Sequence, residues 1–148
     1  MPQSLANVMV HTIFSTKNRE PIIRDEVANQ LYAYIIGILA NIESPSIQIG
    51  GMSDHLHVFF PLGRTNSLSE VMEDVKRSSS KWMKEQGVSN FAWQAGYGAF
   101  SVSESQRDTV VRYIRNQPEH HRKLSFQQEY VRFLKKYKVN YDERYVRD

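Results

Sequence analysis

Two histidines separated by one residue are the first feature of this chain that could do chemistry. His55 and His57 lie in the run DHLHVFF, which predicts a strand over residues 55–62. Because side chains alternate across a strand, both imidazoles point to the same face. Two imidazoles so placed can hold one divalent ion, although a surface or hydrogen-bonded pair fits the same spacing. Burying two unpartnered imidazoles is costly, so we expect an exposed or liganded pair.

A tyrosine and a glutamine four residues apart form the second candidate. Tyr113 and Gln117 fall in VVRYIRNQ, where a helix is predicted over residues 104–117, so they share one helix face. A tyrosine hydroxyl has a pKa of about 10 and attacks only when it is positioned and its target is activated. A metal held by the histidines would polarise a phosphoryl oxygen, and the Gln117 oxygen could complete its shell. The same pair also arises by chance, and the chain has eight tyrosines.

The predicted elements that position these residues follow the order β-α-β-β-α-β and then helices. Strands are predicted over residues 7–16, 46–52, 55–62 and 97–102, and helices over 25–42, 67–87, 104–117 and 126–137. This order is typical of an α+β, ferredoxin-like fold, in which an antiparallel sheet carries two helices on one face. We expect the other face to be open, with the tyrosine on added C-terminal helices.

Composition predicts one soluble domain over residues 1–148, with a core at about 8–103 and a helical tail at 104–148. Of the 148 residues, 41% are hydrophobic and 24% are charged, as in ordinary globular proteins. The absence of cysteine excludes disulfides, a cysteine nucleophile and a thiolate zinc site. No apolar run is long enough for a membrane helix, so we expect a cytoplasmic protein without membrane contact.

The net charge of +3 arises from the C-terminal segment. Residues 118–148 hold 8 basic and 5 acidic residues, whereas residues 1–117 hold 11 of each. A mildly basic tail is compatible with a nearby phosphate backbone, although charge alone does not establish one.

The motifs together resemble a known family. DHLHVFF matches the HUH motif (histidine, bulky hydrophobe, histidine), and YIRNQ matches the tyrosine motif that follows it. HTIFSTKNREPII, LSEVMEDVKRSSSKWMKEQ and FAWQAGYGAFSVS are also similar. Over residues 8–117 the chain resembles the small single-tyrosine HUH transposases of bacterial and archaeal insertion sequences, including their palindrome-associated relatives.

The resemblance implies specific roles at the matching positions. Tyr113 would attack a scissile phosphate of single-stranded DNA, giving a 5′-phosphotyrosine link and a free 3′-hydroxyl. His55, His57 and Gln117 would hold Mg²⁺ or Mn²⁺. The family also implies recognition of DNA hairpins near the element ends, and a homodimer whose active sites are shared between protomers.

Further residues are weaker candidates. His11 would lie beside the histidine pair if the first and third strands are neighbours, and a packed edge histidine is an equal alternative. Asp54 could bond a ligand histidine, but a turn role fits it better. Basic residues on two helices could contact phosphates: Lys76, Arg77, Lys81, Lys84, Arg112 and Arg115. Such charged runs usually form solvated helix faces instead.

Three other functions compete with this interpretation. Another HUH nicking endonuclease, such as a replication initiator or relaxase, usually belongs to a larger protein. A phosphoesterase with two H-x-[ST] motifs would need a second such motif, which the sequence does not offer. A non-catalytic module binding single-stranded nucleic acid on its open sheet would need stacking aromatics, and here the third strand offers only Phe59.

Overall fold

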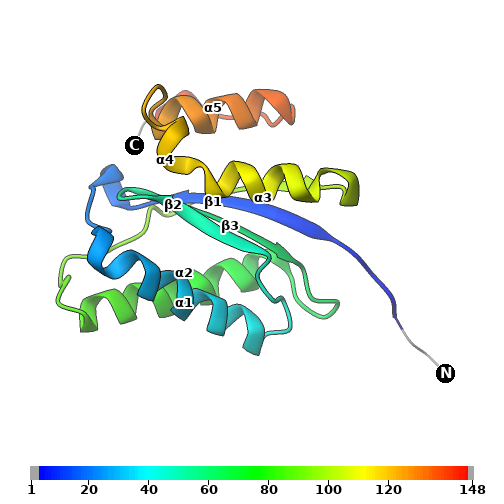
Figure 1. Ribbon diagram of the computed structural model, residues 1–148, viewed down its shortest axis with the longest axis horizontal. Helices are drawn as coiled ribbons and strands as arrows, with labels where there is room; N and C mark the ends of the chain where they lie inside the picture. The colour runs from blue at the N-terminus through cyan, green and yellow to red at the C-terminus, as the bar shows by residue number, and fades with distance from the viewer. Residues whose placement is uncertain (1–3, 147–148) are drawn as a thin grey trace.

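Four segments pair into one antiparallel sheet in the computed structural model, which describes residues 4–146 (Figure 1). The strand order β2-β3-β1-β4 places β1 and β3 at the centre. This order and the chain order of the helices confirm the predicted α+β, ferredoxin-like fold. The strands are β1 (Met9–Ser15), β2 (Gln48–Met52), β3 (His55–Pro61) and β4 (Gly98–Val102).

One face of the sheet is covered by two long helices, α1 (Asp25–Asn41) and α2 (Leu68–Glu85), which lie below it in Figure 1. Alternate residues of β3 point to these helices, and each is almost fully buried: Leu56, Val58 and Phe60. They pack with an apolar stripe on α1 and another on α2. Burying each large aliphatic or aromatic side chain stabilises the fold by about 1.5–3 kcal/mol.

The second face, which we expected to be open, is covered by the C-terminal helices (Figure 1). These are α3 (Arg107–Arg115), α4 (Gln117–His120) and α5 (Phe126–Lys136). The expectation was wrong because apolar side chains also line this face. Ile13, Phe59 and Phe100 are nearly inaccessible to solvent, and they gain their burial from contacts with apolar residues of the C-terminal helices.

Two glycines allow these helices to approach the sheet. A Cβ at Gly50 of β2 would lie 2.8 Å from the carbonyl oxygen of Ile114, and one at Gly98 of β4 would lie 2.5 Å from the Tyr130 ring. Both distances are shorter than real contacts of a Cβ, so a larger residue would displace α3 or the Tyr130 side chain. The closeness of the C-terminal helices therefore depends on the absence of side chains at two strand positions.

The segment predicted as one helix over residues 104–117 is divided. A 3-10 turn, η2 (Glu104–Gln106), precedes α3, and Asn116 separates α3 from α4. The predicted helix ended before Pro118, but Pro118 lies in the first turn of α4. Proline is tolerated there because that turn has no partner for its N–H.

The remaining elements are short, and one cap matters for the site. A 3-10 turn, η1 (Lys17–Arg19), follows β1, and α6 (Glu143–Val146) ends the described chain. Ser125 and Gln128 form a capping box that fixes the start of α5. Within residues 4–146, no helix is long and apolar enough to cross a membrane.

Candidate active site

The histidine pair of β3 lies beneath the C-terminal helices and is fully buried rather than exposed. His55 and His57 face the same side of the sheet, as the alternation predicts, with ring centroids 5.2 Å apart. His11 on the neighbouring β1 shares a hydrogen bond with His57, with 2.8 Å between Nε2 of His11 and Nδ1 of His57. The three imidazoles therefore form one buried group, each held by other polar atoms instead of by solvent.

The outer nitrogens of both histidines are held, so that their inner nitrogens face a common centre. Nδ1 of His55 lies 2.8 Å from Oδ1 of Asp54, which stands in the turn between β2 and β3. Nδ1 of His57 is held by His11. Nε2 of His55 lies 2.9 Å from Oε1 of Gln117. Such bonds to the outer nitrogen orient a metal-ligating imidazole and set its tautomer.

A carboxylate that sequence reasoning did not single out occupies that centre. Oε1 of Glu129 lies 2.9 Å from Nε2 of His57 and 3.4 Å from Nε2 of His55. Nε2 of His121, also not predicted, is 3.2 Å away. Oε2 accepts hydrogen bonds from the Tyr113 hydroxyl and from Nε2 of Gln117. Glu129 therefore joins the histidines, the glutamine and the tyrosine.

Electrostatics in this cluster follow from burial and from the close pairing of opposite charges. Burial favours the neutral acid at Glu129, but its bonds to His121, His55 and His57 hold the pKa far below the usual range. Burial opposes the charged form of His55, yet the bonds to Asp54 and Glu129 outweigh it and raise the pKa to about 9. Burial lowers the pKa of His57. The arrangement thus favours an ionised carboxylate among histidines of unequal basicity.

The Tyr113 side chain is half-buried at the edge of this cluster. Its ring stacks on His120 with centroids 4.4 Å apart. Burial and the adjacent Glu129 carboxylate raise the pKa of its hydroxyl far above 10, so the hydroxyl is protonated and donates to that carboxylate. Although Asn116 interrupts the helix, Tyr113 and Gln117 still meet, because both reach the same carboxylate.

The donor atoms of the cluster fit a divalent ion. Neighbouring donors lie 2.9–3.4 Å apart, measured from His55 Nε2 to Gln117 Oε1 and from Glu129 Oε1 to the histidines. Adjacent ligands of an octahedral ion with bonds of about 2.1 Å are separated by about 3 Å. The ligating atoms of His55, His121 and Glu129 all lie within 4.8 Å of one another. A buried set of imidazole nitrogens and oxygens is also chemically suited to such an ion.

Several predicted contact residues lie away from this site. Lys76 and Arg77 are on α2, across the sheet from the histidines. The Lys76 ammonium donates to the carbonyls of Gln94 and Gly96, and Arg77 pairs with Asp74 at 2.6 Å. Both side chains therefore contact α2 itself or the loop before β4, and neither contacts the histidine cluster. Lys81 and Lys84 share that helix.

Arg112 and Arg115 lie on the same helix as Tyr113, α3, and both are exposed. Within residues 4–146 neither forms an ion pair. They are available to a charged partner on the outer side of α3.

A break in the pattern of α5 was the signal that could have identified Glu129. Apolar residues recur there at helical spacing and face the sheet: Phe126, Tyr130, Phe133, Leu134 and Tyr137. Glu129 falls within this stripe and is 1% exposed. Because an ionised side chain is almost never buried without partners, an acidic residue in an apolar stripe indicates a polar site opposite it. His121 lies in a turn and follows no comparable pattern.

A ferredoxin-like sheet whose His-x-His strand faces a tyrosine helix defines the class of single-tyrosine HUH transposases. The model of the family "Transposase IS200 like" matches residues 4–117, and the chain belongs to this IS200-like transposase family. The ISDra2 transposase TnpA of Deinococcus radiodurans is 25% identical over 114 residues, which cover 72% of this chain and 81% of that protein.

Two solved structures share the fold. A candidate transposase from Deinococcus radiodurans R1 superposes with a TM-score of 0.61 and 23% identity, covering 79% of this chain and 98% of its own. A REP-associated tyrosine transposase, solved bound to a REP hairpin, gives a TM-score of 0.62 and 15% identity, covering 82% and 72%. The family match ends at Gln117, so α5 and its Glu129 lie beyond the matched residues.

Proposed function

We propose that this protein cleaves and rejoins single-stranded DNA through a covalent 5′-phosphotyrosine intermediate. One observation supports this most: in a chain of the IS200-like transposase family, the Tyr113 hydroxyl and the imidazoles of His55 and His57 converge on one buried carboxylate, Glu129. A nucleophile and a set of metal-ligating groups therefore lie in one cluster, as tyrosine-dependent phosphoryl transfer requires.

Tyr113 is the proposed nucleophile. Its oxygen forms a bond to the scissile phosphorus while the bond to the 3′-oxygen breaks, which leaves a 5′-phosphotyrosine and a free 3′-hydroxyl. The nearest acceptor for the phenolic proton is Oε2 of Glu129. Because the covalent link retains the energy of the phosphodiester, attack by another 3′-hydroxyl reverses the step and rejoins strands without a further energy source.

His55, His57 and Gln117 are the proposed ligands of Mg²⁺ or Mn²⁺, and Glu129 and His121 join them. When bound, the ion supplies Lewis-acid polarisation of the scissile phosphate. Asp54 and His11 hold the outer nitrogens of His55 and His57, so they keep the inner nitrogens directed at the centre. In this role Asp54 and His11 are positioning residues.

The proposed substrate is single-stranded DNA with hairpin ends, and the REP-bound relative supports this choice. A homodimer with shared active sites stays a prediction, since Tyr113 and the histidine pair here meet within one chain. Mixing Tyr113→Phe with His57→Ala protein tests sharing. Cleavage restored in the mixture supports shared sites, whereas an inactive mixture shows that each chain uses its own tyrosine.

A covalent adduct is the direct test of the proposed function. Labelled single strands covering the DNA that flanks the gene are incubated with Mg²⁺ or Mn²⁺, and the adduct is measured after denaturation. We expect a metal-dependent adduct with the wild type and with Tyr141→Phe, a control tyrosine on the outer side of α5, but none with Tyr113→Phe. An adduct in Tyr113→Phe would move the chemistry to another residue.

The non-catalytic alternative fits the structure less well. A module that binds nucleic acid on its sheet needs exposed aromatic side chains there. On the second face, Phe59 and Phe100 are buried beneath the C-terminal helices.

A further inference from the structure

A cavity of about 630 Å³ opens beside Tyr113, between α3 and α5. Its size falls in the range of about 300–1,000 Å³ that is usual for ligand pockets. Tyr113 and Glu129 connect it to the cluster described above. Basic and aromatic side chains also line it: His11, Arg132, Phe133, Lys136 and Tyr137.

The rim of this cavity is cationic. Arg132 and Lys136 are one helical turn apart on α5, and both are exposed. Within residues 4–146 neither forms an ion pair. Glu129 is the one carboxylate among the described lining residues, and its oxygens are already bonded to histidines, Gln117 and Tyr113. The two cations are therefore available to an anionic ligand.

Aromatic side chains and His11 line the inner part of the cavity. Phe133 and Tyr137 lie almost parallel, with an interplanar angle of 6°. His11 packs edge-on against Phe133, with centroids 5.2 Å apart. Nδ1 of His11 is the one buried side-chain nitrogen or oxygen without a hydrogen-bond partner in the described chain. Burying such an atom without a partner is unfavourable, and a hydrogen bond from a ligand would remove that penalty.

We propose that this cavity seats the nucleotide of the single-stranded substrate that adjoins the scissile phosphate. Arg132 and Lys136 pair with its backbone phosphates, its base lies against Phe133 and Tyr137, and a polar atom of the nucleotide bonds His11. Single strands are bound by this combination of cations along the backbone and aromatic faces for the bases. The inference rests on the proposed function, in which Tyr113 is the nucleophile.

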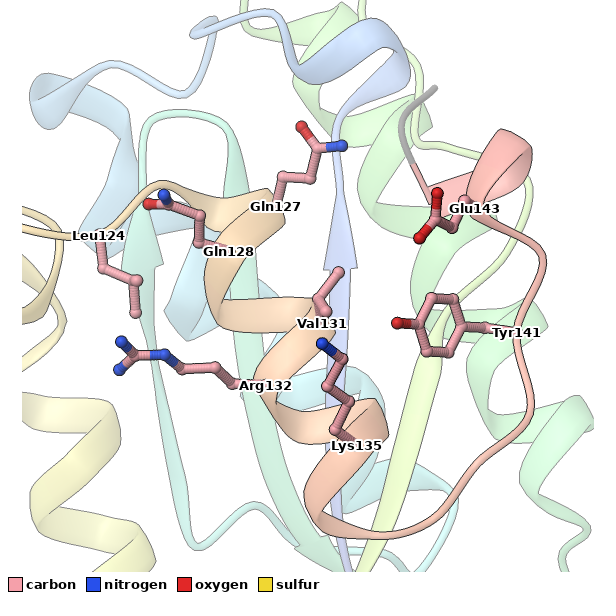
Figure 2. Close-up of a pocket in the computed structure, with 8 residues that line it drawn as sticks. All are labelled: Leu124, Gln127, Gln128, Val131, Arg132, Lys135, Tyr141 and Glu143. Carbon is pink, nitrogen blue, oxygen red and sulfur yellow. The ribbon is translucent and has the colours of Figure 1, made fainter.

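A neighbouring lysine provides a matched control. A second cavity, of about 420 Å³, lies on the outer side of α5. Figure 2 shows its lining residues, among which Lys135 extends past Val131 on the side of Tyr141. Arg132 borders both cavities, and its guanidinium points away from Tyr141. Lys135 and Lys136 are adjacent and equally charged, and both are exposed, but Lys136 alone lines the cavity beside Tyr113.

The test measures binding of a fluorescent 20-nucleotide single strand by anisotropy as a function of salt. All proteins carry Tyr113→Phe, so that cleavage does not interfere. We expect Arg132→Gln and Lys136→Gln each to weaken binding about tenfold at low salt, and to reduce the slope of log K against log salt by about 0.7. Lys135→Gln should change affinity less than twofold. Equal losses for Lys135→Gln and Lys136→Gln would overturn the proposal, because they would show only a general effect of charge.

Photocrosslinking locates the base. Strands carrying 5-iodouracil at successive positions are irradiated with the same proteins, and the crosslinked peptide is identified by mass spectrometry. A crosslink to Phe133 or Tyr137 from a position next to the cut supports the subsite, whereas crosslinks confined to other segments contradict it. If Arg132→Gln and Lys136→Gln bind normally while the wild type forms the Tyr113 adduct, the subsite is refuted and the proposed function stands. Thermal melting confirms that each variant is folded.

Discussion

The two faces of the sheet are buried to a similar degree but are built from different side chains. Between α1, α2 and the sheet, the core is a continuous set of aliphatic and aromatic residues. Beneath α3, α4 and α5, apolar clusters surround a group of buried polar residues: His11, His55, His57, Gln117 and Glu129. Neighbouring residues of one strand serve both faces, since Leu56 lies between His55 and His57 but points to the other side.

The difference separates the source of stability from the source of chemistry. The first face gains free energy from apolar area removed from water. The second face also excludes water, but its buried polar atoms, apart from Nδ1 of His11, are bonded to one another, and this produces the network centred on Glu129. Changes on the first face should therefore alter unfolding alone, whereas changes on the second should alter metal binding and cleavage.

The largest effect is expected from His57→Ala. Loss of this imidazole removes a proposed ligand, so we expect cleavage to fall by about a thousandfold or more, to the detection limit. Mn²⁺ should raise the melting temperature of the wild type but not that of the variant, since an ion stabilises only the protein that binds it. Calorimetry with and without Mn²⁺ provides this second readout. Retained Mn²⁺-stimulated cleavage would refute the assignment of the metal site.

Leu56→Ala changes the adjacent residue on the opposite face. Leu56 is fully buried, so we expect the free energy of unfolding to fall by about 2–5 kcal/mol, as measured by urea denaturation. The increase in melting temperature caused by Mn²⁺ should persist. A variant that lost its response to Mn²⁺ while remaining folded would show that the two faces are not separable.

Glu129→Gln tests the centre of the network. It removes the charge but retains the shape, so we expect metal affinity to fall about 10–100-fold in isothermal titration. Glu119→Gln is the matched control, because Glu119 on α4 is exposed and pairs only with Arg122, at 3.4 Å, among the ion pairs of the described chain. Unchanged affinity in Glu129→Gln would exclude this carboxylate as a ligand.

The smallest effect concerns pH in the metal-free protein. The pKa of His55 is raised from 6.5 to about 9, so the folded state holds this proton more tightly than the unfolded state. The resulting stability is complete below pH 6.5 and is lost as the pH rises through 9, amounting to about 1–3 kcal/mol. Burial lowers the pKa values of His11 and His57. These two groups therefore reduce the free energy of unfolding as the pH falls below 6.5.

Urea denaturation in EDTA at pH 6.5, 8 and 9.5 measures this dependence. Asp54→Asn removes the charged partner of His55 and should flatten the curve over this interval. A curve that is as steep in Asp54→Asn as in the wild type would assign the dependence to another group.

Much of the fold followed from local patterns. The alternation of DHLHVFF predicted that His55 and His57 share one face of β3, and the boundaries of α1 and α5 agree with prediction to within a residue. The place of His11 beside His57 required only the strand order β3-β1. These features depend on periodicity and on pairing rules that act over short segments.

The sequence by itself determined the sheet, the shared face of the histidines and the resemblance that singled out Tyr113 and Gln117. Only the tertiary structure decided that the second face is closed and that Glu129 and His121 reach its centre. Those positions depend on how α5 packs against strands more than 20 residues away in the chain. Periodicity shows that a helix has an apolar face but not which surface that face will cover. A buried carboxylate can therefore be located only once its histidine partners are seen around it.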